Sequence, residues 1–335
     1  MNRRKNITLY CAAGAFLLAL FLSNIFFGSV KIPLRDILAI LSGNFEGRES
    51  WRHIVLETRL PQAVTALLAG SSLAVSGLML QTLFKNPLAG PSILGISDGA
   101  NLGVAVSMIY FATTSYITTI ATAFAGAAVV LALILWFSSK LKNNVMLLIV
   151  GIMMGYLASS VISILNFKAS SDKVHQYVLW GMGDFGNVSI EKLPYFAIIA
   201  IAGLIAAVLL IKPLNALLLG ESYASNLGVN IKRSRLMILG CTGLLTAAAT
   251  AFCGPISFIG LAVPHIARLV LGSSNHQQLL PVTLITGSCI ALLCNMLTLL
   301  PGSNGVLPLS AITPIVCAPV IIYVILNRKN IQYFN

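Results

Sequence analysis

Long runs without a charged side chain divide this chain into apolar segments, and short stretches between them hold almost all of its charge. Runs with the length of one membrane-spanning helix, about 20 residues, lie at 60–84, 143–167, 193–211 and 236–264. Two longer runs, 99–139 and 269–327, have the length of two helices joined by a turn. The pattern therefore predicts an all-α protein whose helices cross a lipid bilayer.

Turn signals at 113–115 and 301–305 indicate where the longer runs reverse. Cutting the chain there predicts about ten spans in a single transmembrane domain over residues 1–335. The predicted spans are 7–27, 60–84, 92–111, 117–139, 144–167, 193–211, 234–253, 256–271, 279–300 and 306–326. The third and eighth are glycine-rich and interrupted by polar residues, so hydropathy is a weak signal for both. An even number of spans puts both termini on one side of the membrane.

Composition and charge agree with this topology. Hydrophobic residues make up 57% of the chain, charged residues 9%, and the mean hydropathy is +0.91, values that water-soluble domains do not reach. The net charge of +12 arises on the side of the N-terminus, where Glu221 is the only acidic residue of the connecting segments. Because Lys and Arg gather in cytoplasmic loops, both termini are predicted to be cytoplasmic, and the charge gives no support to a nucleic-acid partner.

The sequence lacks the motifs of common enzyme classes. It has no G-x-x-x-x-G-K-[ST] loop for ATP, no H-E-x-x-H and no G-x-S-x-G. Its six cysteines form no Cys-x-x-Cys pair and read as apolar packing residues. We therefore expect a chain that moves a substrate and is not an enzyme, with no catalytic residue, no metal site and no cofactor bound directly.

Few ionisable side chains lie within the spans. Asp98 follows a Gly-Pro break, where it would cap or bond freed backbone. His265 and Arg268 share a helix face, where they would either snorkel toward the interface or bind a neighbouring helix end, in preference to relaying protons. An ion-coupled secondary transporter, the alternative of another class, usually carries more buried charge. The energy for transport is therefore expected to come from another source.

A weak internal symmetry is visible in two Gly-Pro segments. GPSILG at 90–95 precedes the third predicted span and GPISFIG at 254–260 precedes the eighth. On the predicted topology they lie on opposite sides of the membrane. This is the arrangement expected of an inverted repeat of spans two to five and seven to ten.

Three long motifs carry a resemblance to a known family. RLPQAVTALLAGSSLAVSGLMLQTLFKNPLAGPSILGIS at 59–97, LGESYASNLGV at 219–229 and GPISFIGLAVPHIAR at 254–268 resemble the FecCD-type permease subunits of ABC importers for iron-siderophore, haem and cobalamin. The resemblance implies a homodimer in the bacterial inner membrane, with two ATPase subunits and a periplasmic or lipid-anchored substrate-binding protein. ATP and Mg would bind to the ATPase chains. The expected cargo is an iron-siderophore, with haem or cobalamin as alternatives.

The resemblance also assigns a cytoplasmic gate. Asn86 and Leu88 match the family's Asn-Pro-Leu segment at the inner mouth of the pathway, and Asn143 and Asn144 would form the facing constriction. Non-helical backbone is tolerated at membrane depth where it is buried in protein or lines a water-filled path. From the residues alone, a turn that only reverses the chain is the preferred interpretation.

The longest inner loop, 213–231, is predicted to couple the permease to the ATPase. Its apolar residues recur at helical spacing, with glycines where a helix would break or end, and in the family this loop fits a groove on the ATPase. The residues expected to take part are Leu214, Leu218, Gly220, Glu221, Ala224, Leu227 and Gly228. The alternative is an interfacial helix that lies on the membrane.

On the outer side, the resemblance places an arginine at the start of the second span, where it would meet acidic residues of the binding protein. Arg59 matches this position, whereas Gln62 stands where a second arginine is usual. Arg48 and Arg52 could compensate, although acidic residues alternate with them and a solvated mixed loop is the alternative.

Overall fold

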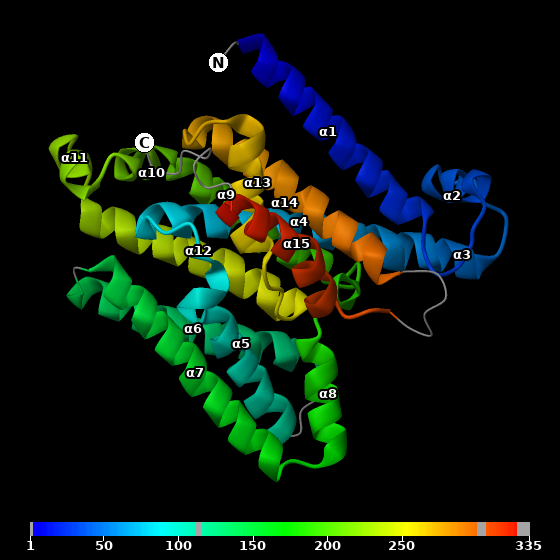
Figure 1. The fold of residues 1–335 in the computed structure, drawn as a ribbon. Coiled ribbons are helices and arrows are strands. Elements are labelled where there is room, and N and C mark those ends of the chain that lie inside the picture. Colours follow the sequence, from blue (N-terminus) through cyan, green and yellow to red (C-terminus); the bar gives the residue numbers. More distant parts are fainter. Residues whose placement is uncertain (1–2, 112–114, 142, 300–305, 327–335) are drawn as a thin grey trace.

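The computed structural model describes residues 3–111, 115–141, 143–299 and 306–326, and these residues form helices and no strands (Figure 1). The prediction of an all-α protein is therefore confirmed for this part of the chain. The helices are α1 Arg3–Phe26, α2 Leu34–Leu41, α3 Glu49–His53, η1 Ile54–Arg59, α4 Leu60–Phe84, η2 Pro91–Leu94, α5 Ile96–Ala105, η3 Val106–Tyr110, α6 Tyr116–Lys140, α7 Asn144–Lys168, α8 Ser171–Gly181, η4 Phe185–Asn187, α9 Leu193–Leu209, α10 Ile211–Leu218, α11 Glu221–Asn226, α12 Ile231–Cys253, α13 Ile259–Leu271, α14 His276–Thr298 and α15 Leu309–Leu326.

Each predicted span corresponds to a helix or to a short series of helices. Within the described residues, six helices are long and apolar enough to cross a membrane, or seven if α9 and α10, bent by 50°, count as one. The third, eighth and tenth predicted spans form shorter helices, so the number of ten crossings stays a prediction. The turns predicted at 113–115 and 301–305 lie outside the described residues, apart from Ser115.

α4 lies at the centre of the bundle because its small side chains allow neighbouring helices to approach closely. Nearly all of its residues are buried, and it contacts α14, α12, α13 and α9. A methyl group on Gly70 would overlap the backbone of Gly287 in α14, and one on Gly77 would overlap the carbonyl of Gly260 in α13. Such small-residue contacts are typical of helix packing in membranes, where van der Waals contact replaces the hydrophobic effect.

The contacts between helices repeat in the two halves of the chain, as the predicted inverted repeat requires. α5 contacts α6 and α7, and α13 contacts α14 and α15 in the same way. The first helix of each half crosses to the other half, because α4 packs on α14 and α12 packs on α6. In Figure 1, α5, α6 and α7 gather below α12, whereas α13 and α14 lie above it.

α1 is largely exposed, and buried polar contacts attach its end to the bundle. The guanidinium of Arg59 donates to the carbonyls of Ile25 (2.9 Å) and Phe26 (3.1 Å), and also to that of Val30. These are carbonyls at and beyond the end of α1, where a helix leaves acceptors unsatisfied. One turn further, Gln62 donates to Asn295 (3.0 Å), which donates to Asn24 of α1 (2.8 Å).

We predict that Gly77→Ala destabilises the protein, because the added methyl group would push α4 away from the backbone of α13. Overpacking of this kind costs about 1–3 kcal/mol. Gly240→Ala is the matched control, since no atom lies within 4 Å of the added methyl group, and it should leave stability unchanged or raise it. Thermal unfolding of the purified protein in detergent measures both, and equal unfolding temperatures for the two variants would contradict the packing argument.

Candidate gate and coupling site

α4 ends in a turn built from the Lys-Asn-Pro-Leu segment. The N–H groups of Lys85 and Asn86 return to the carbonyls of Thr82 (3.3 Å) and Gln81 (3.2 Å), which is a Schellman cap. This cap places Lys85 in the left-handed region (φ 47°, ψ 35°), a conformation that glycine usually supplies. The side chain of Asn86 then accepts from the N–H of Leu88 (2.9 Å).

The turn is exposed on one side and anchored to α13 on the other. Leu88 is 46% exposed, whereas the carbonyl of Pro87 accepts a hydrogen bond from Nε2 of His265 (2.8 Å). Gln81 donates to the carbonyl of Leu261 (3.1 Å) and accepts from Arg268 (2.6 Å). His265 and Arg268 therefore bind a neighbouring helix end, as the sequence predicted.

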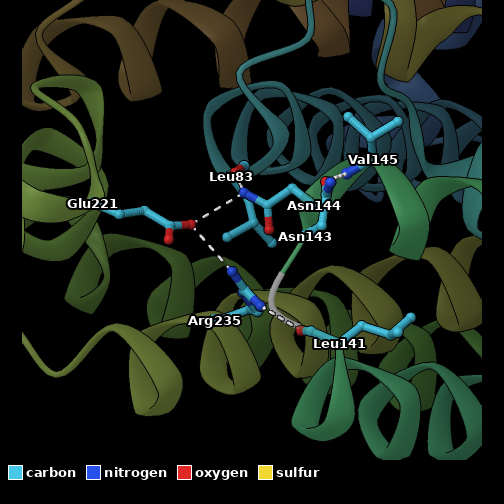
Figure 2. Close-up of polar contacts among 7 residues, drawn as sticks. All are labelled: Leu83, Leu141, Asn143, Asn144, Val145, Glu221 and Arg235. Carbon is cyan, nitrogen blue, oxygen red and sulfur yellow. Dashed lines mark hydrogen bonds and ion pairs between the residues drawn. The ribbon is translucent and has the colours of Figure 1, made fainter.

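Asn143 and Asn144 have two different roles at the start of α7 (Figure 2). Asn143 caps the helix by accepting from the N–H of Val145 (2.8 Å). Asn144 uses both hydrogens of its amide nitrogen, one toward the carbonyl of Leu83 in α4 and one toward Oε1 of Glu221 in α11, each at 3.1 Å. The predicted constriction therefore lies against the last turn of α4, although only Asn144 reaches it.

Segment 213–231 forms two short helices, α10 and α11, separated by Gly220 at φ 113° and followed by Gly228 at φ 81°. Leu214 and Ala224 are fully buried and Leu218 is half-buried, so these predicted coupling residues face the bundle in whole or in part. Leu227 is 63% exposed.

An exposed apolar row runs from the end of α10 along α11. Leu219, Tyr223 and Leu227 are each 59–65% exposed. Tyr223 and Leu227 lie four residues apart and share one face at α11, whereas Leu219 precedes the break at Gly220. Only Leu227 was predicted to take part in coupling. The row shows that α11 presents its apolar side outward, whereas α10 uses its leucines for packing.

Glu221 also joins α11 to α12. Its Oε1 atom accepts from the guanidinium of Arg235 (3.1 Å), which is 7% exposed and donates as well to the carbonyl of Leu141 (3.1 Å) (Figure 2). A paired and largely buried arginine of this kind fixes geometry through bonds that are costly to break singly. The carboxylate of Glu221 therefore joins α11 to α7 and α12, and the amide of Asn144 extends this connection to α4.

A second polar cluster was not predicted. His276, the first residue of α14, is fully buried; its Nε2 lies 2.8 Å from the hydroxyl of Thr82, and its Nδ1 lies 2.9 Å from Oδ1 of Asn215 in α10. Asn215 donates in turn to Asn275 (3.0 Å). The signal was the polar stretch 273–278 inside an otherwise uncharged run, which reads as the N-terminal cap of a helix.

The predicted docking arginines lie at the opposite end of α4. Arg48 and Arg52 are exposed, and Arg48 lies over the ring of Trp51 at 5.5 Å. Arg59 is only 5% exposed because it binds the end of α1. Within the protomer, the guanidinium of Arg59 is therefore buried and makes structural hydrogen bonds. A role of Arg59 in docking stays a prediction.

α8 and η4 cover the end of α12 that lies farthest from segment 213–231. The N–H of Asp184 donates to the carbonyl of Cys253 (2.8 Å). Burial raises the pKa of the Asp184 carboxyl, although a hydrogen bond from the N–H of Gly186 opposes this shift. Burial, and then the charge of Asp98, raise the pKa of Tyr177 to about 12. The tyrosine therefore stays neutral and stacks on Trp180.

Comparisons with known proteins agree with this arrangement. The model of the FecCD transport family matches residues 16–327. The hemin transport system permease HmuU of Yersinia pestis is 31% identical over 291 residues, covering 85% of this chain and 87% of HmuU. The vitamin B12 import permease BtuC of Vibrio cholerae is 33% identical over 281 residues, covering 83% of this chain and 84% of BtuC.

A solved structure described as an inward-facing conformation of a metal-chelate type ABC transporter shares the fold. Its TM-score is 0.84 at 28% identity, over 96% of this chain and 99% of the other. The family model and both relatives cover most of the chain. The chain therefore belongs to the FecCD transport family and is a membrane-spanning permease subunit of an ABC importer.

Proposed function

We propose that this permease carries a metal chelate, most simply an iron-siderophore, across the bacterial inner membrane with both termini in the cytoplasm. Haem and cobalamin are the alternatives, because the relatives are named for hemin and vitamin B12 transport. The observation that carries the proposal is the attachment of segment 213–231 to the last turn of α4. Segment 213–231, which would respond to the ATPase, thereby lies next to the Asn-Pro-Leu turn, which would close the pathway.

The working assembly would be a homodimer with two ATPase subunits, which bind ATP and Mg, and a substrate-binding protein outside. The exposed row Leu219, Tyr223 and Leu227 suits a protein groove. Tyr223 and Leu227 share one face at α11, and apolar anchors at helical spacing are the usual way in which a short helix is recognised. Leu88 and its copy in the second protomer would close the inner mouth, with Asn86 holding the turn and Asn144 bracing it.

Uptake in a strain that lacks this chain tests the proposal. Labelled ferric siderophore, haem and cobalamin are each supplied to the deletion strain and to the complemented strain. We expect complementation to restore uptake of one chelate class, and this uptake should depend on ATP. Uptake that survives ATP depletion but stops when the ion gradient collapses would support a secondary transporter and contradict the proposal.

We predict that Leu227→Asp abolishes uptake and lowers the amount of ATPase that purifies with the permease. A charge in the centre of an apolar contact loses its hydration without gaining a partner, which costs several kcal/mol. Ser225→Asp is the matched control, because Ser225 is exposed on α11 but lies off the row. Co-purification and uptake that fall equally in both variants would contradict recognition by this face.

We also predict that Arg48→Glu together with Arg52→Glu slows docking of the binding protein and reduces the dependence of its association rate on salt. Exposed charges act mainly on the rate of encounter and are screened beyond about 8 Å at physiological ionic strength. Lys232→Glu, an exposed cation near the gate end of α12, should leave docking unchanged. Stopped-flow association at several salt concentrations measures the effect, and an unchanged salt slope in the double variant would argue for a solvated loop.

A further inference from the structure

Two rows of hydrogen bonds connect segment 213–231 with consecutive residues in the last turn of α4. One row starts at the hydroxyl of Thr82, passes through the ring of His276 and ends on Asn215 of α10. The other starts at the carbonyl of Leu83, passes through the amide of Asn144 and ends on Glu221 of α11 (Figure 2). Both helices of the segment therefore reach α4 immediately before Lys85.

The donors and acceptors of the first row can be assigned. Oδ1 of Asn215 accepts from the backbone N–H of His276 (2.8 Å) and, since a carbonyl oxygen cannot donate, also from Nδ1–H of the ring (2.9 Å). A buried imidazole without a carboxylate partner is neutral, so its Nε2 is bare and can only accept. The Thr82 hydroxyl has one proton and two acceptors in reach, Nε2 of His276 (2.8 Å) and the carbonyl of Leu78 (3.0 Å). Of these two, only Nε2 has no other donor, because the Leu78 carbonyl also lies within the backbone ladder of α4. Replacement of this hydroxyl by a methyl group leaves the ring nitrogen without a donor.

The second row is directional as well. The amide nitrogen of Asn144 has only two hydrogens, and the carbonyl of Leu83 and the carboxylate of Glu221 accept one each. Movement of α11 that carries Glu221 away would also break its bond to Arg235. If segment 213–231 moves and the end of α4 does not move with it, hydrogen bonds of the two rows have to break, and this costs free energy.

We propose that Thr82, His276 and Asn215, together with Asn144 and Glu221, are positioning residues that transmit movement of segment 213–231 to the Asn-Pro-Leu turn. The inference rests on the proposed function, because it assumes that the ATPase moves this segment. A shift in the last turn of α4 is passed on through Lys85 and Asn86, whose side chain holds the N–H of Leu88. Leu88 is therefore displaced when α10 and α11 move.

The test uses the whole complex of permease, ATPase and binding protein in proteoliposomes. The variants are Thr82→Val and Glu221→Met, alone and combined, which keep the size of each side chain and remove its polar atoms. Three quantities are measured: ATP hydrolysed, substrate carried, and cross-linking of Leu88→Cys between protomers with and without nucleotide. The cross-linking background carries Cys11→Ser, since Cys11 is exposed and the other cysteines are buried.

The combined variant loses three hydrogen bonds, Thr82–His276, Asn144–Glu221 and Arg235–Glu221. We expect it to hydrolyse ATP, to carry at least about tenfold less substrate per ATP, and to cross-link at position 88 regardless of nucleotide. Thr82→Ser and Glu221→Gln keep an acceptor or donor at each position and should restore coupling. Thr246→Val is the matched control: it removes a buried hydroxyl that pairs with Ser76 of α4 (3.0 Å) but has no link to the segment.

Three outcomes would overturn the inference. In the first, the combined variant transports and cross-links like the wild type. In the second, Thr246→Val lowers coupling as much as Thr82→Val, which would show that the hydroxyl acts only through general packing. In the third, the wild-type complex itself shows no ATP-driven transport, a result that refutes the proposed function and is told apart from the first two by the wild-type measurement alone.

Discussion

The end of α4 has to satisfy its backbone polar groups inside a bundle of packed helices. A helix leaves its last carbonyls without partners within the helix, and an unpaired polar group in an apolar environment costs a few kcal/mol. Here the N–H of Asn86 in the turn and the amide of Asn144 in α7 donate to carbonyls of the last turn. His265 of α13 donates to the carbonyl of Pro87 in the turn that follows. Arg268 of α13 and His276 of α14 bind side chains of the same last turn, those of Gln81 and Thr82. The hydrogen bonds that allow α4 to end at this place therefore also hold the elements around the proposed gate together.

Hydropathy and motif spacing predicted much of this arrangement. The apolar runs predicted an all-helical membrane protein, and the three long motifs predicted the FecCD family; both predictions are confirmed. The glycine-rich third and eighth spans form helices in spite of their weak signal, because close approaches such as those of Gly103 in α5 to the carbonyl of Thr122 and of Gly260 in α13 to the carbonyl of Leu73 need glycine. Hydropathy and helix-propensity scales instead give glycine a low score for a membrane-spanning helix.

Side-chain direction was harder to predict than helix position. Leu214 and Leu227 both belong to the apolar pattern of segment 213–231. Leu214 is nevertheless fully buried and Leu227 is largely exposed, because α10 packs on the bundle and only α11 extends beyond it. Arg59, for which a role in docking stays a prediction, binds the end of α1 within the protomer. Its direction depends on where a helix more than thirty residues earlier in the chain ends, and local spacing holds no information about that end. His276 was missed since a single histidine at a helix start indicates a cap and says nothing about its partner in α10.

One continuous helix connects the end of the protein proposed to dock a binding protein with the end proposed to form the gate. α3, η1 and α4 form a single helical stretch, Glu49–Phe84, of 36 residues, which at 1.5 Å per residue extends roughly 50 Å, more than the hydrocarbon thickness of a bilayer. Arg52 lies near its first turn, and Thr82 and Leu83 lie in its last. Because α4 is buried along its length and locked to α13 and α14 through glycine contacts, it cannot bend freely between these ends. A force applied at either end therefore has to move α4 together with the helices packed on it. A tilt of that group is the motion that both proposed partners, a binding protein at one end and an ATPase at the other, would impose.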